Sequence, residues 1–232
     1  MNRVEELAAN LAEVRERIDK ACASAERDPA GVELLAVTKT FPASDVALLC
    51  DLGLSRFAEN RDQEAGPKSR ELAEARPDAD VRWHMVGSVQ RNKARSVVGW
   101  AHRVDSVDST RLADALARAA TAPLEVLIQV SVDGDPKRGG VPFDGLAELA
   151  AHVARTDELV LRGVMTVAPL GTHPGQAFAA LEQAVTRLRD DHPDATVISA
   201  GMSGDLEDAI AHGSTCVRVG TALLGSRRLA SP

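Results

Sequence analysis

The stretch LLAVTKTFPASDVALLCDLG, residues 34–53, joins a short apolar run to a segment with helical character. The apolar residues from Leu34 onward are typical of a buried strand, and Pro42 stands where a following helix would begin. Lys39 lies at the outlet of that strand, although lysine normally belongs on a wet surface. This unit predicts a buried strand that carries an amine to its carboxyl end, followed by a helix.

The same alternation continues along the chain. After the run at 32–39, further strand-like runs are found at 55–59, 81–87, 102–107, 124–132, 161–168, 196–201 and 216–220. A segment with helical character follows each run, which indicates βαβ units and a parallel sheet. This pattern in a chain of 232 residues favours an α/β fold of the (β/α)8 TIM-barrel type. A doubly wound sheet is the alternative, but no GxGxxG motif follows the first strand.

Residues 3–22 are predicted to form an amphipathic helix in front of the barrel. We expect one domain over residues 1–232, in which residues 1–28 provide this helix and pack it on the barrel. A dimer or partner surface is the alternative use of the apolar face. The apolar residues of that face recur at spacings of three and four, and they are Val4, Leu7, Leu11, Val14, Ile18 and Cys22.

Composition and charge narrow the class of protein. The formal net charge is −7, which does not favour binding to nucleic acid or to an anionic membrane surface. The three cysteines are far apart and form no CxxC motif, so we expect free thiols in a reducing compartment. No apolar run approaches the roughly 20 residues of a membrane span. We expect a cytoplasmic protein, and the six histidines show no metal-ligand spacing.

In a barrel of parallel strands, functional groups come from the carboxyl ends of the strands. The last two predicted strands end in SAGMSGD (199–205) and RVGT (218–221), where Ser203 and Thr221 stand beside glycines. Each of these segments precedes a predicted helix, whose first N–H groups favour a phosphate. The loops after strands 7 and 8 are also the recurring phosphate site of this fold. Caps and tight turns without a ligand are the alternative interpretation.

An amine at a barrel mouth loses solvation, which favours its neutral, nucleophilic form. Such a lysine condenses with a carbonyl to a Schiff base, and a nearby phosphate seat points to a phosphorylated carbonyl ligand. Pyridoxal 5′-phosphate (PLP) carries both groups. Arg218 lies two residues before Gly220, so its side chain points to the same side of the strand. Because arginine only donates hydrogen bonds, it would keep a pyridine nitrogen unprotonated and weaken the ring as an electron sink.

Other polar residues near the strand outlets have two interpretations each. His84 would border the cofactor ring or be a buried structural histidine. Asn60 would contact the cofactor hydroxyl or the lysine, and Glu59 would pair with a nearby base inside the barrel. The basic groups at 91–95 (Arg91, Lys93 and Arg95) and at 137–138 (Lys137 and Arg138) are expected on solvated surfaces, with a second PLP site as the alternative.

Five motifs together resemble those of the PLP homeostasis proteins, also described as the proline synthetase co-transcribed family. The resemblance runs from about residue 32 to residue 226, and its motifs are AVTKTFP, FAENRDQE, WHMVGSVQRNK, RGVMTVAP and SAGMSGDLEDAIAHGSTCVRVGTALLG. The resemblance implies a barrel like the N-terminal domain of bacterial alanine racemase. It also implies PLP bound to the lysine of the first strand. Members of the family are thought to hold and deliver PLP without a firmly established enzymatic activity.

Carried over to this chain, the resemblance makes Lys39 the Schiff-base residue and places Arg218 at the ring nitrogen. Ser203, Gly220 and Thr221 would hold the phosphate. Asn60 and Met202 would line the pocket. The family often has G-E-N-x-V-Q-E on its second strand, whereas this chain has AENRDQE at 58–64, with alanine for glycine and Asp62 for valine.

These observations predict a PLP carrier or buffer in intracellular PLP homeostasis that affects amino-acid and keto-acid balance, without robust catalysis. PLP-dependent apo-enzymes are the candidate recipients, and the family resemblance implies a monomer. A PLP-dependent racemase is the first alternative, but alanine racemase uses a tyrosine as its second base and this chain has no tyrosine. A cofactor-free Schiff-base aldolase on the same barrel and a purely structural Lys39 are the others.

Overall fold

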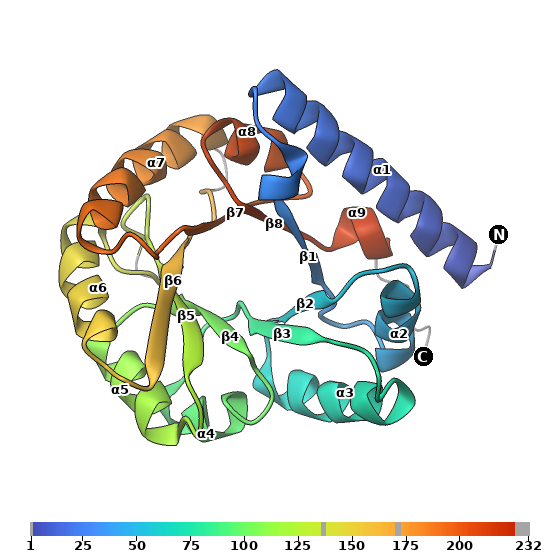
Figure 1. The fold of residues 1–232 in the computed structure, drawn as a ribbon, viewed down its shortest axis with the longest axis horizontal. Coiled ribbons are helices and arrows are strands. Elements are labelled where there is room, and N and C mark those ends of the chain that lie inside the picture. Colours follow the sequence, from blue (N-terminus) through green and yellow to red (C-terminus); the bar gives the residue numbers. More distant parts are fainter. Residues whose placement is uncertain (1, 136–137, 170–172, 226–232) are drawn as a thin grey trace.

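The computed structural model describes residues 2–135, 138–169 and 173–225. In this part of the chain eight parallel strands close into a barrel in chain order, and β8 returns to pair with β1. Helices surround the barrel on its outside, as the view down the molecule shows (Figure 1). The predicted (β/α)8 barrel is therefore confirmed, and the doubly wound sheet is excluded.

Each predicted strand run overlaps an observed strand, although β6 begins at Leu159, before the predicted start at 161. The strands are β1 (Glu33–Val37), β2 (Arg56–Glu59), β3 (Arg82–Met85), β4 (Arg103–Val107), β5 (Leu124–Gln129), β6 (Leu159–Met165), β7 (Val197–Met202) and β8 (Cys216–Val219). The helices are α1 (Arg3–Ser24), α2 (Ala43–Asp51), α3 (Asp62–Ala75), α4 (Ala94–Val97), α5 (Thr110–Ala119), α6 (Leu146–Ala154), α7 (Pro174–Asp191), α8 (Leu206–Ala211) and α9 (Thr221–Leu224). Short 3₁₀ helices span Pro29–Gly31, Arg91–Lys93 and Phe143–Gly145.

Helix α1 begins with a capping box. The side chain of Asn2 accepts from the Glu5 N–H, and the Glu5 carboxylate accepts from the Asn2 N–H. The predicted apolar face is confirmed except at Val4, which is 43% exposed. Val4 lies in the first turn, beyond the surface that covers the rest of the face. The buried residues of α1 are Leu7, Leu11, Val14, Ile18, Ala21 and Cys22.

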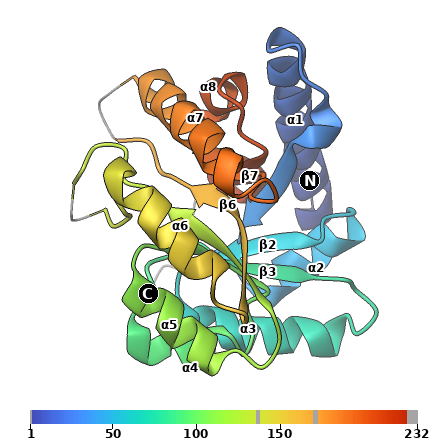
Figure 2. The same ribbon diagram turned by 60° about the vertical axis from the view of Figure 1, so that its left-hand side comes forward.

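This helix lies outside the ring of helices, against α8 and α9 (Figures 1 and 2). Polar contacts hold α1 in place, in addition to the packing of its apolar face. The guanidinium of Arg17 pairs with Glu207 at 2.8 Å and also donates to the carbonyl of Ser203 at 2.9 Å. The amide of Asn10 donates to the carbonyl of Leu223 at 2.9 Å. Helix α1 is thereby tied to the loops that follow β7 and β8.

A β-bulge in β6 changes which side chains face the barrel interior. Val126 of β5 pairs with Leu161, but Leu127 pairs with Gly163, so Arg162 is the extra residue. Gly163 has a φ of 147°, and a Cβ at this position would collide with the carbonyl oxygen of Val197. The bulge therefore depends on a glycine, because the neighbouring strand approaches too closely for any side chain.

The interior of the barrel is unusually polar. A small apolar cluster of Leu35, Ala58 and Cys216 lies there, separate from the large core between strands and helices. Beside it, Arg103 donates from Nε to the buried carboxylate of Asp105 at 2.9 Å. His84 on β3 is 3% exposed, and its Nδ1 lies 3.9 Å from Asp105.

Burial sets the protonation of these interior groups. It lowers the pKa of His84 well below the usual value, and the charge of Arg103 lowers it further. Burial raises the pKa of Asp105, although Arg103 opposes the shift. It also raises the pKa of the Cys216 thiol to about 12. At neutral pH the interior therefore holds a neutral imidazole and a neutral thiol.

The cysteines Cys22, Cys50 and Cys216 are free thiols. Within the described ranges, no helix is both long and apolar enough to cross a membrane. In the same ranges, no group of three or more His, Cys, Asp or Glu side chains is arranged to hold a metal ion.

Replacement of Gly163 by alanine tests the close approach at the bulge. We expect Gly163→Ala to lower the free energy of unfolding by more than about 1 kcal/mol, because the side chain meets backbone and the φ disfavours it. Gly31→Ala is the matched control, since nothing lies within 4 Å of a Cβ there, and its effect should stay within about 0.5 kcal/mol. Urea unfolding followed by circular dichroism measures both; equal midpoints for the two variants would contradict the close approach.

The neutral His84 predicts loss of stability on acidification. Below pH about 6.5 the unfolded chain protonates this histidine while the folded chain does not, so the unfolded state binds more protons. The free energy of unfolding should then fall as the pH falls from 7.5 to 5.5, by at most about 1.4 kcal/mol per pH unit from this one group. His84→Gln should flatten this slope, whereas His173→Gln at an exposed histidine should not. An unchanged slope in His84→Gln would contradict a neutral buried imidazole.

Candidate functional site

Lys39 lies two residues beyond the last residue of β1, at the carboxyl-terminal mouth of the barrel. Val37 packs on the interior cluster, so the alternation of the strand directs Lys39 toward the same side. The residue occupies a tight turn, which the N–H of Phe41 closes by donating to the carbonyl of Thr38 at 3.1 Å. Thr40, the third residue of that turn, has a φ of 70°.

The side chain of Lys39 is exposed. This differs from the expectation of a desolvated amine, because β1 ends at Val37 and the turn raises the lysine to the rim. Its amine makes no hydrogen bond or ion pair within the described part of the chain. The amine is thus available to a ligand that enters the mouth.

Asn60 stands at the same level of the rim as Lys39. Val37 pairs with Ala58, and each of the two polar residues lies two positions further along its strand direction. Asn60 is half-buried, and its backbone packs directly on Gly87, where a Cβ would collide with the Asn60 carbonyl oxygen. Gly87 in turn accepts a hydrogen bond from the Ser106 hydroxyl at 2.6 Å. These contacts of Asn60, Gly87 and Ser106 therefore connect the carboxyl ends of β2, β3 and β4.

The unusual Asp62 of the second-strand motif has a structural explanation. Its carboxylate accepts a hydrogen bond from the indole N–H of Trp100 at 3.0 Å, and both residues are buried. It is also the first residue of α3, where a carboxylate interacts favourably with the helix dipole. Asp62 therefore attaches the start of α3 to the segment before β4. Ala58, the other departure from the motif, belongs to the interior cluster.

The predicted phosphate residues lie close together, from two different strands. The hydroxyl of Ser203, after β7, accepts from the backbone N–H of Ala222 at 3.4 Å, in the first turn of α9. Gly220 precedes that helix, and a Cβ there would lie 3.3 Å from the carbonyl oxygen of Val37 on β1. Thr221 is exposed at the helix start. The seat is therefore on the strand that neighbours the one carrying Lys39.

Arg218 is buried below this seat, 5% exposed. One terminal nitrogen donates to the Ser199 hydroxyl at 2.8 Å, and the other donates to the Thr166 carbonyl at 2.6 Å. Burial lowers the pKa of Arg218, but an arginine has so high a pKa that the group stays protonated. Contacts from β6 and β7 thus fix a cation inside the barrel on β8.

The last two predicted site residues are His84 and Met202, and Met202 pairs with Arg218 across β7 and β8. His84 is enclosed within the barrel beside Asp105, as described above, so its role next to a ring stays a prediction. Met202 ends β7 and is 38% exposed, and its N–H donates to the Asp205 carboxylate at 2.5 Å. Its proposed place in the pocket wall also stays a prediction.

Two polar contacts at the mouth were not foreseen from the sequence. Lys68 of α3 is buried and pairs with Glu59 at 2.6 Å. Glu59 was expected to find a base inside the barrel, but it faces outward, toward α3, because its neighbour Ala58 faces the interior. Lys68 follows Pro67 in a polar helix, and no periodic signal distinguishes it from an exposed lysine. Arg138 donates to the carbonyls of Val167 and Ala168, at 2.8 and 2.6 Å, and so connects the loops after β5 and β6.

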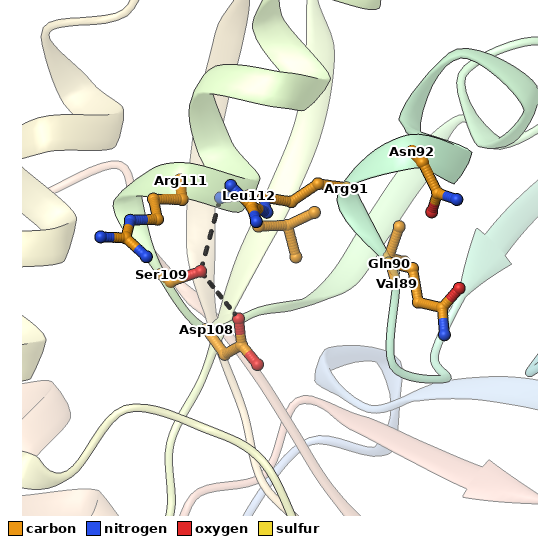
Figure 3. A pocket seen from close by; sticks show the side chains of 8 residues that line it. All are labelled: Val89, Gln90, Arg91, Asn92, Asp108, Ser109, Arg111 and Leu112. Carbon is orange, nitrogen blue, oxygen red and sulfur yellow. Dashed lines mark hydrogen bonds between the residues drawn. The ribbon is translucent and has the colours of Figure 1, made fainter.

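A separate open cavity of about 600 Å³ lies beside the mouth, between the loop after β3 and the start of α5. Arg91 and Arg111 are among its lining residues, and Figure 3 shows them on these two elements, with Ser109 and Asp108 joined by a hydrogen bond. Lys93 and Arg95 do not line this cavity. The other candidate for a second PLP site involves Lys137, which lies outside the described residues.

Three comparisons with known proteins agree with this geometry. The family model of the alanine racemase N-terminal domain matches residues 5–228. The pyridoxal phosphate homeostasis protein of Mycobacterium tuberculosis is 47% identical over 249 residues, covering 100% of this chain and 96% of that protein. The pyridoxal phosphate homeostasis protein of Escherichia coli K12 is 40% identical over 229 residues, covering 96% and 97%.

Among solved structures, PipY of Synechococcus elongatus with PLP bound superposes with a TM-score of 0.82. It is 32% identical in sequence, and the match covers 94% of this chain and 100% of that one. Identity at this level over nearly the whole length defines the family as well as the fold. The chain belongs to the alanine racemase N-terminal domain family and, within it, to the pyridoxal phosphate homeostasis proteins.

Proposed function

We propose that this chain binds PLP covalently through Lys39 and acts in intracellular PLP homeostasis, as a carrier or buffer without robust catalysis of its own. One observation carries the proposal: Lys39, exposed and without a polar partner in the described residues, follows β1, and the neighbouring strand β8 leads into Gly220 and the first turn of α9 beside Ser203. The relative PipY, whose structure holds PLP, supports this choice of ligand. The names of the relatives support the homeostatic role.

The residues at the mouth fit the chemical groups of PLP. The Lys39 amine would attack the aldehyde carbon, and loss of one water would leave a C=N bond. The hydroxyls of Ser203 and Thr221 and the backbone at Gly220 would hold the phosphate, because donors at a helix start favour an anion. Gly220 has no side chain, so a phosphate could approach this backbone closely.

Arg218 determines what kind of chemistry the site supports. When bound, PLP supplies an aldehyde and a pyridine ring that withdraws electrons best when its nitrogen is protonated. A guanidinium has no acceptor and stays charged, so it would donate to that nitrogen and keep it unprotonated. Because Ser199 and Thr166 already fix Arg218, this choice is built into the barrel. A weak electron sink fits a carrier better than an amino-acid-converting enzyme.

A PLP-dependent amino-acid racemase is the alternative function. The fold family includes alanine racemase, and an accessible lysine linkage exchanges with amino acids in principle. Two-base racemisation of the alanine racemase type needs a tyrosine opposite the lysine, and this chain has none. A cofactor-free Schiff-base aldolase would use Lys39 as well, but it predicts a colourless protein.

Other parts of the function are also proposals. PLP-dependent apo-enzymes are candidate recipients of the cofactor, since an exposed rim lysine allows handover. A monomer fits the burial of the apolar face of α1 against α8 and α9 within the same chain. A cytoplasmic location fits the free thiols.

Replacement of Lys39 by alanine tests the covalent attachment. After incubation with PLP and desalting, the wild type should be yellow and Lys39→Ala should be colourless, because the variant lacks the amine that retains the cofactor. The melting temperature of the apo-protein should be nearly unchanged, since an exposed side chain contributes little packing. Absorption spectra and thermal melts measure these two properties.

Exposed Lys20 provides the control, since Lys20→Ala should stay yellow. A colourless wild type that takes up no PLP would remove the proposed function and favour the cofactor-free aldolase. A yellow Lys39→Ala would remove this lysine from the linkage. Amino-acid turnover by the yellow wild type, assayed next, decides between the carrier and the racemase.

Replacement of Arg218 by alanine tests the ring-nitrogen contact. We expect Arg218→Ala to bind PLP about tenfold or more weakly, since a charged hydrogen bond contributes about 1.5–3 kcal/mol. The visible absorption maximum should also shift, because the ring nitrogen loses its donor. Arg162→Ala serves as the control at an exposed arginine, which pairs with Glu125. Equal affinity and an identical spectrum in Arg218→Ala would place the arginine outside the site.

A further inference from the structure

We propose that Glu59 and Lys68 are positioning residues that hold the turn presenting Lys39. Together with Thr38 they form a buried polar cluster, called here the Thr38 staple. The inference rests on the proposed PLP attachment at Lys39, but the turn itself is a feature of the protein without ligand. Neither Glu59 nor Lys68 belongs to the group of residues expected to touch the cofactor.

The staple is a closed set of short hydrogen bonds. The Lys68 ammonium donates to Glu59 Oε1 at 2.6 Å and to the carbonyl oxygen of Thr38 at 2.9 Å. The Thr38 hydroxyl donates to the same Glu59 oxygen at 2.7 Å. Thr38 is therefore held at both its side chain and its carbonyl. Thr38 and Glu59 are 0% exposed and Lys68 is 8% exposed.

The alternation of β1 explains why the staple holds Thr38 rather than Lys39. Leu35 and Val37 face the barrel interior, so Thr38 faces outward, toward α3. The next residue, Lys39, is thereby turned back toward the mouth. Thr38 is thus anchored in the layer between the barrel and the helices, and its neighbour Lys39 is presented to the ligand.

The anchored residue is the first of a strained turn. Its carbonyl oxygen, already bonded to Lys68, also accepts from the Phe41 N–H that closes the turn. The third position of such a turn needs a positive φ and usually holds glycine. Here it holds Thr40, with a φ of 70°, and a β-branched residue is a genuine outlier in this region. Strained backbone of this kind persists only where the surroundings hold it in place.

The staple is a costly way to stabilise a fold. Two charges leave water, and Glu59 Oε2 is buried without a hydrogen-bond partner in the described structure. Apolar residues of similar volume often replace a buried ion pair without loss of stability. The ion pair is therefore better explained by the geometry that it imposes on Thr38.

That geometry matters for bond formation at Lys39. The amine must reach the aldehyde carbon while the phosphate is seated at Gly220 on the adjacent strand, and one water leaves as the C=N bond forms. Misplacement by about 1 Å costs such a step up to about a hundredfold in rate. A turn that relaxes away from the strained conformation would move the lysine relative to the seat.

The double variant Glu59→Met/Lys68→Met tests the proposal. It removes both charges together, so neither is left unpaired, and it keeps similar side-chain volume. We expect a folded protein whose rate of PLP capture, followed by visible absorbance, is about tenfold or more below that of the wild type. The Phe41 amide of the apo-protein should exchange with deuterium about tenfold faster, because its acceptor is no longer held.

Addition of Thr40→Gly to the double variant separates positioning from a merely structural role. Glycine adopts a positive φ without strain, so the turn no longer needs to be held. We expect PLP capture to return to within about threefold of the wild-type rate. Val153→Ala, a cavity in α6, is the stability control, and it should lower the melting temperature without slowing capture.

Two results would overturn the proposal. The first is a double variant with capture and Phe41 exchange within about twofold of the wild type. The second is slow capture that Thr40→Gly leaves unchanged. If the wild type itself captures no PLP, the proposed function fails on its own, and the exchange rate of the Phe41 amide in the apo-protein still decides whether the staple holds the turn. Should the double variant fail to fold, Thr38→Val removes only the hydrogen bond from the Thr38 hydroxyl to Glu59. PLP capture should then be slower and Phe41 exchange faster than in the wild type, by smaller factors, and unchanged values of both would overturn the proposal.

Discussion

The pairing of β8 with β1 is the constraint on which the candidate site depends. It runs from Glu33 and Cys216 to Ala36 and Val219, and it closes the barrel. Through it Lys39, which follows the first strand, lies next to the strand that leads into Gly220 and Thr221, the predicted phosphate residues, although almost the whole chain lies between them. The close approach at Gly220, where a Cβ would lie 3.3 Å from the carbonyl oxygen of Val37, is a direct consequence of that closure.

Buried polar side chains form two separate groups, one on each side of the barrel wall. On the inside, Arg103, Asp105 and His84 form a buried set below Arg218. On the outside, Thr38 meets Glu59 and Lys68 under α3. Alternation along each strand allows one short segment to contribute to both sides. The ligand-facing residues thus receive support from two layers, and buried charge is offset by pairing in each.

The sequence predicted the architecture and the residues with a local signal. The strands and the barrel follow from the periodicity of the apolar residues. The place of Lys39 at the end of a strand follows from its position in the sequence. Other features depend on contacts between distant segments and left no local signal. The bulge at Arg162 changes the strand faces because Val197 approaches Gly163, and Lys68 is buried because Thr38 offers a carbonyl. The exposure of Lys39 differs from expectation for a related reason: where β1 stops is set by the turn that the staple holds, which no pattern of apolar residues encodes.

The same features argue for holding and release rather than for turnover. A rim lysine in contact with solvent forms a linkage that water can reverse, since the hydrolysis of a C=N bond needs only water and returns the amine. A buried arginine, held by Ser199 and Thr166, only donates hydrogen bonds, so at the pyridine nitrogen, as proposed, it would leave the ring a poor electron sink. A phosphate held at Ser203, Gly220 and Thr221, as proposed, would add a second attachment to the linkage at Lys39, and either attachment could be released first.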